Sequence, residues 1–215
     1  MPGFVESADL EELQMMNVHA EAELERAIQD AHMGGERELG TLLDHYRPML
    51  LRMAKQRLGP ALRVRISGSD LVQETLLSAT RNFQAFRGNS ARQLQGWMLR
   101  ILKARLTDGL RRHWVAERRR LSGPSNHGYT SSRPALLDGS ASPSKIAVLR
   151  EQSTALWKAL AELDEQDRQV LVLRYVEQLG FEEIAARMQL PLSSVWRRWR
   201  KTVESLKSRL EDEGF

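Results

Sequence analysis

A group of basic and small polar side chains follows Pro191 near the C-terminus. If this segment is helical, Val195, Trp199 and Thr202 return to one inner side, and the polar group is left outside. An arginine can form two parallel hydrogen bonds with guanine in the major groove of DNA, which is wide enough to admit a helix. The pattern therefore predicts a helix that reads duplex DNA, with an ordinary helical hairpin as the alternative. The outer residues are Ser193, Ser194, Arg197, Arg200 and Lys201.

A second basic region covers residues 87–120, where only Asp108 and Glu117 are acidic. At helical spacing, one side of this region combines basic side chains with an aromatic ring. Cations along a helix suit the phosphates of a nucleic-acid strand, and a ring can stack on a base. A solvated helix face is the alternative. The side consists of Arg100, Lys103, Thr107, Arg111 and Trp114.

The segment FRGNS leads into this region and is short and polar. Gly88 permits tight backbone geometry, and the side chains of Asn89 and Ser90 carry donors and acceptors that can contact a base edge. An ordinary turn, in which Asn89 or Ser90 caps the following helix, is the alternative.

A surface of another kind is predicted just before this segment. Val72, Leu76 and Phe83 share the inner face of an expected helix, whereas Asp70, Gln73, Glu74 and Leu77 lie three and four residues apart on the opposite side. A leucine between two carboxylates and an amide indicates a partner-binding patch, although single exposed leucines are common.

These surfaces require helices to position them. Apolar residues recur at helical spacing through most of the chain, and no segment alternates with the period of a strand, so the predicted fold class is all-α. A short turn at residues 190–192 joins the last two helices into a helix-turn-helix. The expected helices cover residues 22–33, 38–58, 70–86, 92–117, 146–162, 165–178, 181–188 and 193–211.

Residues 122–144 are crowded with Ser, Gly and Pro, a composition that buries too little apolar surface to order itself. They predict a flexible linker between two small helical domains. The start of the chain is acidic, because Arg26 is its single base up to Ala27. The predicted organisation is an acidic extension (1–21), a helical domain (22–120), a linker (121–145) and a helix-turn-helix domain (146–215).

Composition excludes several classes of function. The chain contains no cysteine, which removes disulfides, thiolate zinc sites and cysteine nucleophiles. The histidines lack ligand spacing and no phosphate loop or nucleophile motif occurs, so we expect no catalytic, metal or cofactor site. No apolar run approaches the ~20 residues that cross a bilayer, and the acidic start differs from a signal peptide, so we expect a cytoplasmic protein without membrane insertion.

Taken together, these residues resemble the sigma factor family of bacterial RNA polymerase, and specifically its compact extracytoplasmic-function (ECF) members. The stretches LLDHYRPMLLRMAKQRLG, DLVQETLL and FQAFRGNSARQLQGWMLRILKARLTDGLRR resemble the promoter-melting domain, sigma region 2. The stretch ALAELDEQDRQVLVLRYVEQLGFEEIAARMQLPLSSVWRRWRKTVESL resembles the promoter-recognition domain, sigma region 4. The resemblance implies an alternative sigma factor, which binds core RNA polymerase and promoter DNA to begin transcription.

By this resemblance, Asp70, Gln73, Glu74 and Leu77 would dock on the clamp helices of polymerase. The minus-ten element, with one base taken out of the stack, would be engaged by Phe86, Arg87, Asn89, Ser90, Arg100, Lys103, Thr107, Arg111 and Trp114. Arg198 joins Ser193, Ser194, Arg197, Arg200 and Lys201 as residues that would face the minus-thirty-five element. The chain departs from the family at Ala104, where Asn is frequent, and at Gln189, where the turn usually has Gly.

Other readings stay open from the sequence alone. A helix-turn-helix regulator would bind an operator without polymerase, and a helical adaptor would have no nucleic-acid role; an enzyme is the least supported class. An anti-sigma protein is a further partner that the family allows. The acidic extension would contact such a partner, shield the basic surfaces or stay disordered.

Overall fold

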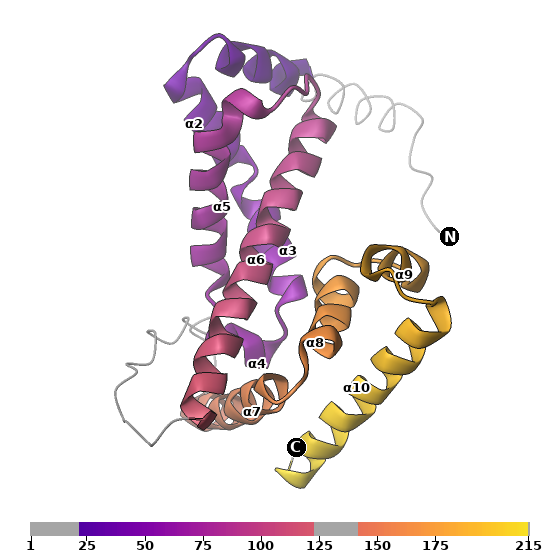
Figure 1. Ribbon diagram of the computed structural model, residues 1–215. Helices are drawn as coiled ribbons and strands as arrows, with labels where there is room; N and C mark the ends of the chain where they lie inside the picture. Colours follow the sequence, from indigo (N-terminus) through magenta and orange to yellow (C-terminus); the bar gives the residue numbers. More distant parts are fainter. Residues whose placement is uncertain (1–21, 123–141, 215) are drawn as a thin grey trace, which may run out of the picture. The chain divides into compact units, whose positions relative to one another are not determined.

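The computed structural model describes residues 22–122 and 142–214. Within these ranges every regular element is a helix, which confirms the predicted all-α class (Figure 1). The acidic extension at residues 1–21 and most of the predicted linker, residues 123–141, lie outside the described residues. A helix over residues 22–32 precedes α2 Glu36–His45, α3 Arg47–Arg57, α4 Pro60–Arg63, α5 Gly68–Asn82, η1 Phe83–Ala85, α6 Ala91–Ser122, α7 Pro143–Ala161, α8 Glu165–Leu171, η2 Val172–Val176, α9 Phe181–Met188 and α10 Leu192–Asp212.

The described residues pack into two compact units. The first combines the residues up to Leu50 with Gln73–Ile101, and the second combines Leu51–Val72 with the residues from Leu102 onward. Both divisions fall inside helices, because α5 and α6 each contribute to both units. The predicted domain boundaries at 22–120 and 146–215 therefore stay a prediction.

The first unit is organised around a cluster of rings. Phe83 and Phe86 are buried, with ring centroids 5.8 Å apart, and Phe86 lies 5.2 Å from the ring of Trp97. His32 stacks on Phe86 at 5.9 Å, which ties the first described helix to the segment before α6. Tyr46 donates a hydrogen bond of 3.3 Å to the carbonyl of Ala91 at the start of α6. The cluster thus fixes the position of residues 86–90.

In the second unit, α6 buries a row of side chains that recurs every four residues. Leu102, Leu106, Leu110 and Trp114 are all buried, as the helical repeat requires of a face that packs on other helices. The segment Gly68–Val72 of α5 lies beside this part of α6, since a Cβ built at Gly109 would stand 3.7 Å from the side chain of Leu71.

The helix-turn-helix at α9 and α10 has a small core of its own, which consists of Leu173, Ile184 and Val195. The turn is closed by Gln189, whose φ of 54° lies in the left-handed region that favours glycine. The N–H of Leu190 reaches back to the carbonyl of Ala185 at 3.0 Å, a bond typical of helix C-termini that end in this conformation. The departure from glycine noted in the sequence therefore does not change the left-handed backbone of the turn.

Candidate nucleic-acid interface

The residues predicted to read DNA lie together on one side of α10, with the exception of Arg198. Val195 and Thr202 are buried, so the helix has a fixed inner side. On the outer side Ser193, Arg197, Arg200 and Lys201 are exposed, and Ser194 is half-buried. Small and basic side chains at the N-terminal end of a second helix are what contact with base edges in the major groove requires.

The structure corrects the expected position of Arg198. Its guanidinium lies 2.6 Å from a carboxylate oxygen of Asp167 and 3.4 Å from one of Asp164, at the start of α8. The pKa of Asp164 is lowered, chiefly by a hydrogen bond from the backbone N–H of Asp167 and further by the charge of Arg198. The residue sits on the flank of α10 that faces α8, and it holds the two helices together instead of pointing outward.

Two apolar residues that the sequence prediction missed lie on the outer side of α10. Trp196 is 46% exposed, and Leu192 is exposed to the same extent. The guanidinium carbon of Arg200 lies 5.7 Å from the centroid of the Trp196 ring, and Arg200 also pairs with Glu204 at 2.8 Å. The sequence does indicate the exposure of Trp196, because its angular position around the helix lies outside the inner stripe of Val195, Trp199 and Thr202.

The segment before α6 is held rigidly by its own packing. Phe86 is buried in the ring cluster, and a Cβ at Gly88 would stand 2.4 Å from the Phe86 ring, so only glycine fits there without a shift. His32 forms a 3.2 Å hydrogen bond with the Gly88 carbonyl. The expectation that Phe86 faces a base is therefore not met, because its ring belongs to the core.

The same segment also caps α6. The side chain of Gln93 accepts hydrogen bonds from the backbone N–H groups of Asn89 at 2.9 Å and Ser90 at 3.3 Å, and the Ser90 hydroxyl accepts from the N–H of Gln93 at 3.3 Å. This reciprocal arrangement is a capping box. The cap leaves the side chains of Arg87 and Asn89 exposed.

The basic stripe predicted along α6 is only partly exposed. Arg100 and Arg111 are exposed, whereas Thr107 and Lys103 are half-buried. The ammonium of Lys103 donates to the carbonyl of Glu177 at 3.0 Å. Trp114, predicted to stack on a base, is 9% exposed and faces the guanidinium of Arg168 at 5.9 Å. The structure does not show the exposure that was predicted for Trp114, because its side chain continues the buried row of Leu102, Leu106 and Leu110.

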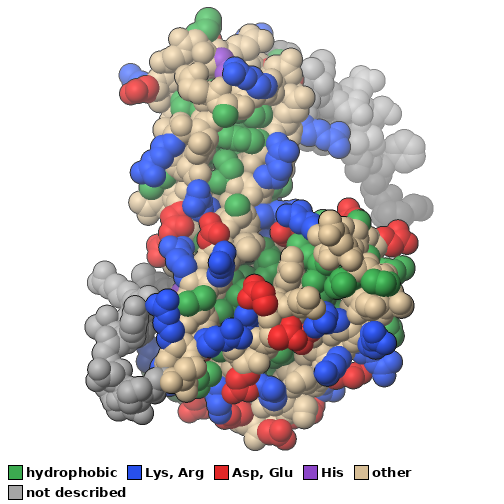
Figure 2. Space-filling view, in the orientation of Figure 1, with side chains coloured by type: hydrophobic (Ala, Val, Ile, Leu, Met, Phe, Trp, Pro, Cys, Tyr) green, Lys and Arg blue, Asp and Glu red, His purple; other side chains and the backbone are tan. Residues whose placement is uncertain are grey.

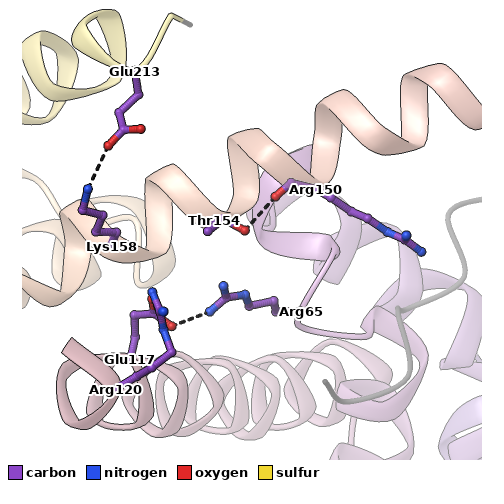
Figure 3. A network of polar contacts seen from close by, with 7 residues as sticks. All are labelled: Arg65, Glu117, Arg120, Arg150, Thr154, Lys158 and Glu213. Atoms are coloured by element: carbon purple, nitrogen blue, oxygen red, sulfur yellow. Dashed lines mark hydrogen bonds and ion pairs between the residues drawn. The ribbon is translucent and has the colours of Figure 1, made fainter. Parts of the chain in front are cut away.

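Further along α6, Glu117 is a buried carboxylate between two arginines (Figure 3). Its oxygens accept from Arg65 at 2.9 Å and from Arg120 at 2.6 Å. Burial opposes ionisation of Glu117, but the hydrogen bonds and charges of Arg120 and Arg65 outweigh it and lower the pKa. Arg118 donates to the carbonyls of Ala161 and Leu163. Arg118 and Arg120, at the basic end of α6, therefore make internal contacts.

The residues of the predicted partner patch lie along one side of α5. Asp70, Gln73 and Leu77 are exposed, and Glu74 is half-buried. Leu77 is 49% exposed, while Val72, Thr75 and Leu76 on the opposite side are buried. The amphipathic division predicted for this helix is therefore correct.

Two kinds of site have no counterpart in the described ranges. Neither range contains a group of three or more His, Asp or Glu side chains that could hold a metal ion. Within the same residues, no helix combines the length and apolar character that a bilayer crossing requires.

Two family models match the chain. Residues 42–115 match Sigma-70 region 2, and residues 153–206 match Sigma-70, region 4. The first match contains α5 and most of α6, and the second contains the helix-turn-helix.

Several curated proteins are similar to most of the chain. The ECF RNA polymerase sigma factor SigD of Mycobacterium tuberculosis is 26% identical over 185 residues, which cover 86% of this chain and 82% of the relative. SigW of Bacillus subtilis is 23% identical over 189 residues, covering 88% and 97%. The ECF sigma-E factor of Escherichia coli is 27% identical over 147 residues, covering 66% and 73%.

The helix-turn-helix and its exposed basic face define a helical DNA-binding protein. The two matches together identify the class further: the chain belongs to the sigma-70 family, as an alternative sigma factor of the ECF type. It directs promoter recognition by RNA polymerase in transcription initiation.

Proposed function

We propose that three surfaces divide the work of initiation. The exposed side of α5, at Asp70, Gln73, Glu74 and Leu77, binds core RNA polymerase. The start of α6, with Arg87, Asn89, Ser90 and Arg100, engages the minus-ten strand. The outer face of α10, with Ser193, Ser194, Arg197, Arg200 and Lys201, reads the minus-thirty-five element as duplex. The protein performs no catalysis itself and acts in the cytoplasm, where polymerase and promoter lie.

The observation that carries this proposal is the two-sided character of α10. Burial of Val195 and Thr202 fixes the rotation of the helix, and that rotation turns Arg197, Arg200 and Lys201 outward together. A helical adaptor without a nucleic-acid role would not require three unburied cations at this end of a helix-turn-helix. A cationic face of this kind supports phosphate and base contacts in a major groove.

Transcription from a promoter library, with the full chain and purified core polymerase, tests the whole proposal. Core polymerase should initiate only when the wild-type protein is present. The complex should then select a preferred sequence at both elements. Retention of DNA by the protein alone, with no change in polymerase specificity, would instead support a regulator that acts without polymerase.

The polymerase-binding surface has its own test. Replacing Gln73 and Leu77 together with alanine should abolish co-purification with core enzyme, since both side chains are exposed and contribute little to folding. Val148→Ala/Gln166→Ala is the matched control, because it also removes one exposed aliphatic and one exposed amide. An anti-sigma protein that used the α5 surface would compete with polymerase in the same assay.

The minus-ten surface is tested at Asn89. Asn89→Ala removes a side chain that can bond a flipped base, but the capping hydrogen bonds to Gln93 come from backbone N–H groups and are retained. Base preference should relax at one minus-ten position and stay unchanged at minus-thirty-five. An unaltered preference at every minus-ten position would remove Asn89 from the proposal.

A further inference from the structure

Two exposed apolar side chains lie among the polar residues of α10. Leu192 and Trp196 are four residues apart, so they lie one above the other on the same side of the helix. Both are 46% exposed, although Val195 beside them is fully buried and Trp199 is half-buried. Figure 2 shows apolar side chains at the surface around α9 and the start of α10, next to Lys and Arg side chains.

Trp196 is not an isolated surface residue, since it is built into a row of contacts. Arg200 lies over its ring at 5.7 Å, and Glu204 holds the other end of Arg200 through a 2.8 Å ion pair. The three residues are spaced by four along α10, which makes them neighbours on one face. These contacts fix the indole ring of Trp196 beside a cation, close to the exposed Arg197 and Ser193.

In the major groove, the base edges carry one protruding apolar group that an exposed indole ring can contact. That group is the C5-methyl of thymine, because the other base edges present hydrogen-bond donors, acceptors and flat C–H positions without a protruding apolar group. An indole supplies a large contact area with few rotatable bonds, and Trp196 stands within the first two turns, the part of a recognition helix that meets base edges. The surrounding cations complement the charge of DNA and disfavour a basic protein partner.

We propose that Trp196 is a specificity-determining residue that packs on a thymine methyl in the minus-thirty-five element, with Leu192 extending the apolar contact. The proposal rests on the assignment of α10 to that element and names the feature that it reads. Replacing thymine by uracil removes the methyl and leaves every hydrogen-bonding group of the base pair in place, so it isolates this contact.

The experiment uses the full chain bound to core polymerase. An upstream element is first selected from a randomised library with the wild type, and each thymine in the selected duplex is then replaced by uracil, one at a time. For the wild type, one replacement should weaken promoter binding about fourfold, which corresponds to the burial of one methyl-sized group. Trp196→Ala should bind both duplexes equally, and Trp196→Phe should keep part of the preference.

Tyr175→Ala is the matched control, because Tyr175 is a similarly exposed aromatic of the same unit outside α10. This variant should keep the full fourfold effect of the uracil replacement. Binding of each variant to core polymerase is measured in parallel. Loss of core binding by Trp196→Ala would show a protein contact and overturn the proposal.

The outcomes separate this proposal from the proposed function. If the wild type selects no upstream sequence, the assignment of α10 to the minus-thirty-five element fails. If it selects a sequence without thymine, or if the uracil effect persists in Trp196→Ala, the thymine contact fails while the assignment of α10 stands.

Discussion

Helices α6 and α10 carry similar basic sequences, yet the structure uses them differently. In α10 the cations Arg197, Arg200 and Lys201 stay exposed. In α6, Lys103 bonds a carbonyl, Trp114 is buried and Arg118 donates to two carbonyls. The same residue types therefore form an exposed cationic face in α10, whereas several of them make internal contacts in α6.

The difference shows that a pattern of basic residues does not determine which of them are exposed in the fold. Helical spacing determines which side chains share a face, but not which faces meet another helix. Helix α10 has one buried apolar stripe, so its opposite side stays exposed. The second half of α6 has apolar or aromatic residues on more than one side, and carbonyls of other segments lie within reach of its long cations.

The tryptophans give the largest expected contrast between the two helices. Trp114→Ala should lower the free energy of unfolding by about 3–5 kcal/mol, because it leaves a cavity under the buried row of α6. Trp196→Ala should change it by less than about 0.5 kcal/mol, because the indole is half in solvent. Urea unfolding measures both values. A stable Trp114→Ala protein with defective promoter opening would instead support the base-stacking role of Trp114.

The carboxylates give the next contrast. Glu117→Gln should cost about 2–3 kcal/mol of unfolding free energy, because Arg65 and Arg120 lose a buried anionic partner. Glu204→Gln in α10 is the control, and it should leave the free energy of unfolding nearly unchanged, since its pair with Arg200 is solvent-exposed. Equal losses in the two variants would mean that both pairs are equally exposed in solution.

Acid should reveal the same buried site. Because the pKa of Glu117 is lower in the folded protein than its usual value of 4.5, its stabilisation is complete above that value. The stabilisation is lost as the pH falls through the folded pKa. The difference in unfolding free energy between wild type and Glu117→Gln should therefore shrink below about pH 4. A difference that stays constant from pH 6 to pH 3 would argue against an ionised Glu117.

The arginines of α10 test the outward face directly. Arg197→Ala should weaken promoter binding by about 1–3 kcal/mol, at one base position if it contacts a base and uniformly if it contacts phosphate. Arg198→Ala should instead lower stability and leave base preference intact, because Arg198 pairs with Asp164 and Asp167. Binding titrations at several salt concentrations distinguish the two modes for Arg197. If the outer face of α10 reads DNA, the two variants must differ: Arg197→Ala should weaken promoter binding, and Arg198→Ala should lower stability.

The smallest effect is expected at the turn that orients α10. Gln189→Gly should raise the unfolding free energy by about 1 kcal/mol, since glycine adopts the φ of 54° without steric cost. Thermal unfolding would show a modest rise in Tm. A fall in Tm would indicate that the Gln189 side chain stabilises the turn by more than its backbone conformation costs.

Most of the fold was predictable because it depends on local patterns. The spacing of apolar residues gave the helices, and the turn at residues 190–192 separated α9 from α10 as expected. The 3₁₀ turn at Phe83–Ala85 and the π-helix at Val172–Val176 were predicted as plain helix. Both depend on tertiary packing at helix ends, which a periodic pattern does not encode.

The candidate site was predictable where one side of a helix faces solvent. The faces of α5 and α10 were found from angles alone, apart from Arg198, which bonds acids that follow α7 in the chain. Phe86 and Trp114 were misassigned because their burial depends on rings and helices distant in the sequence. Trp196 was missed because basic residues dominate the outer face of α10, and an aromatic next to the buried Val195 is typical of a core position.

The distribution of the five tryptophans also has an optical consequence. Trp114 and Trp157 are buried, Trp97 and Trp199 are half-buried, and Trp196 is the most open to solvent of the five. A water-soluble quencher such as iodide should therefore reduce the fluorescence of Trp196 first, while the buried indoles continue to emit. The protein thus carries an intrinsic fluorophore on the outward face of α10, whose shielding from the quencher would report in real time when that face becomes covered.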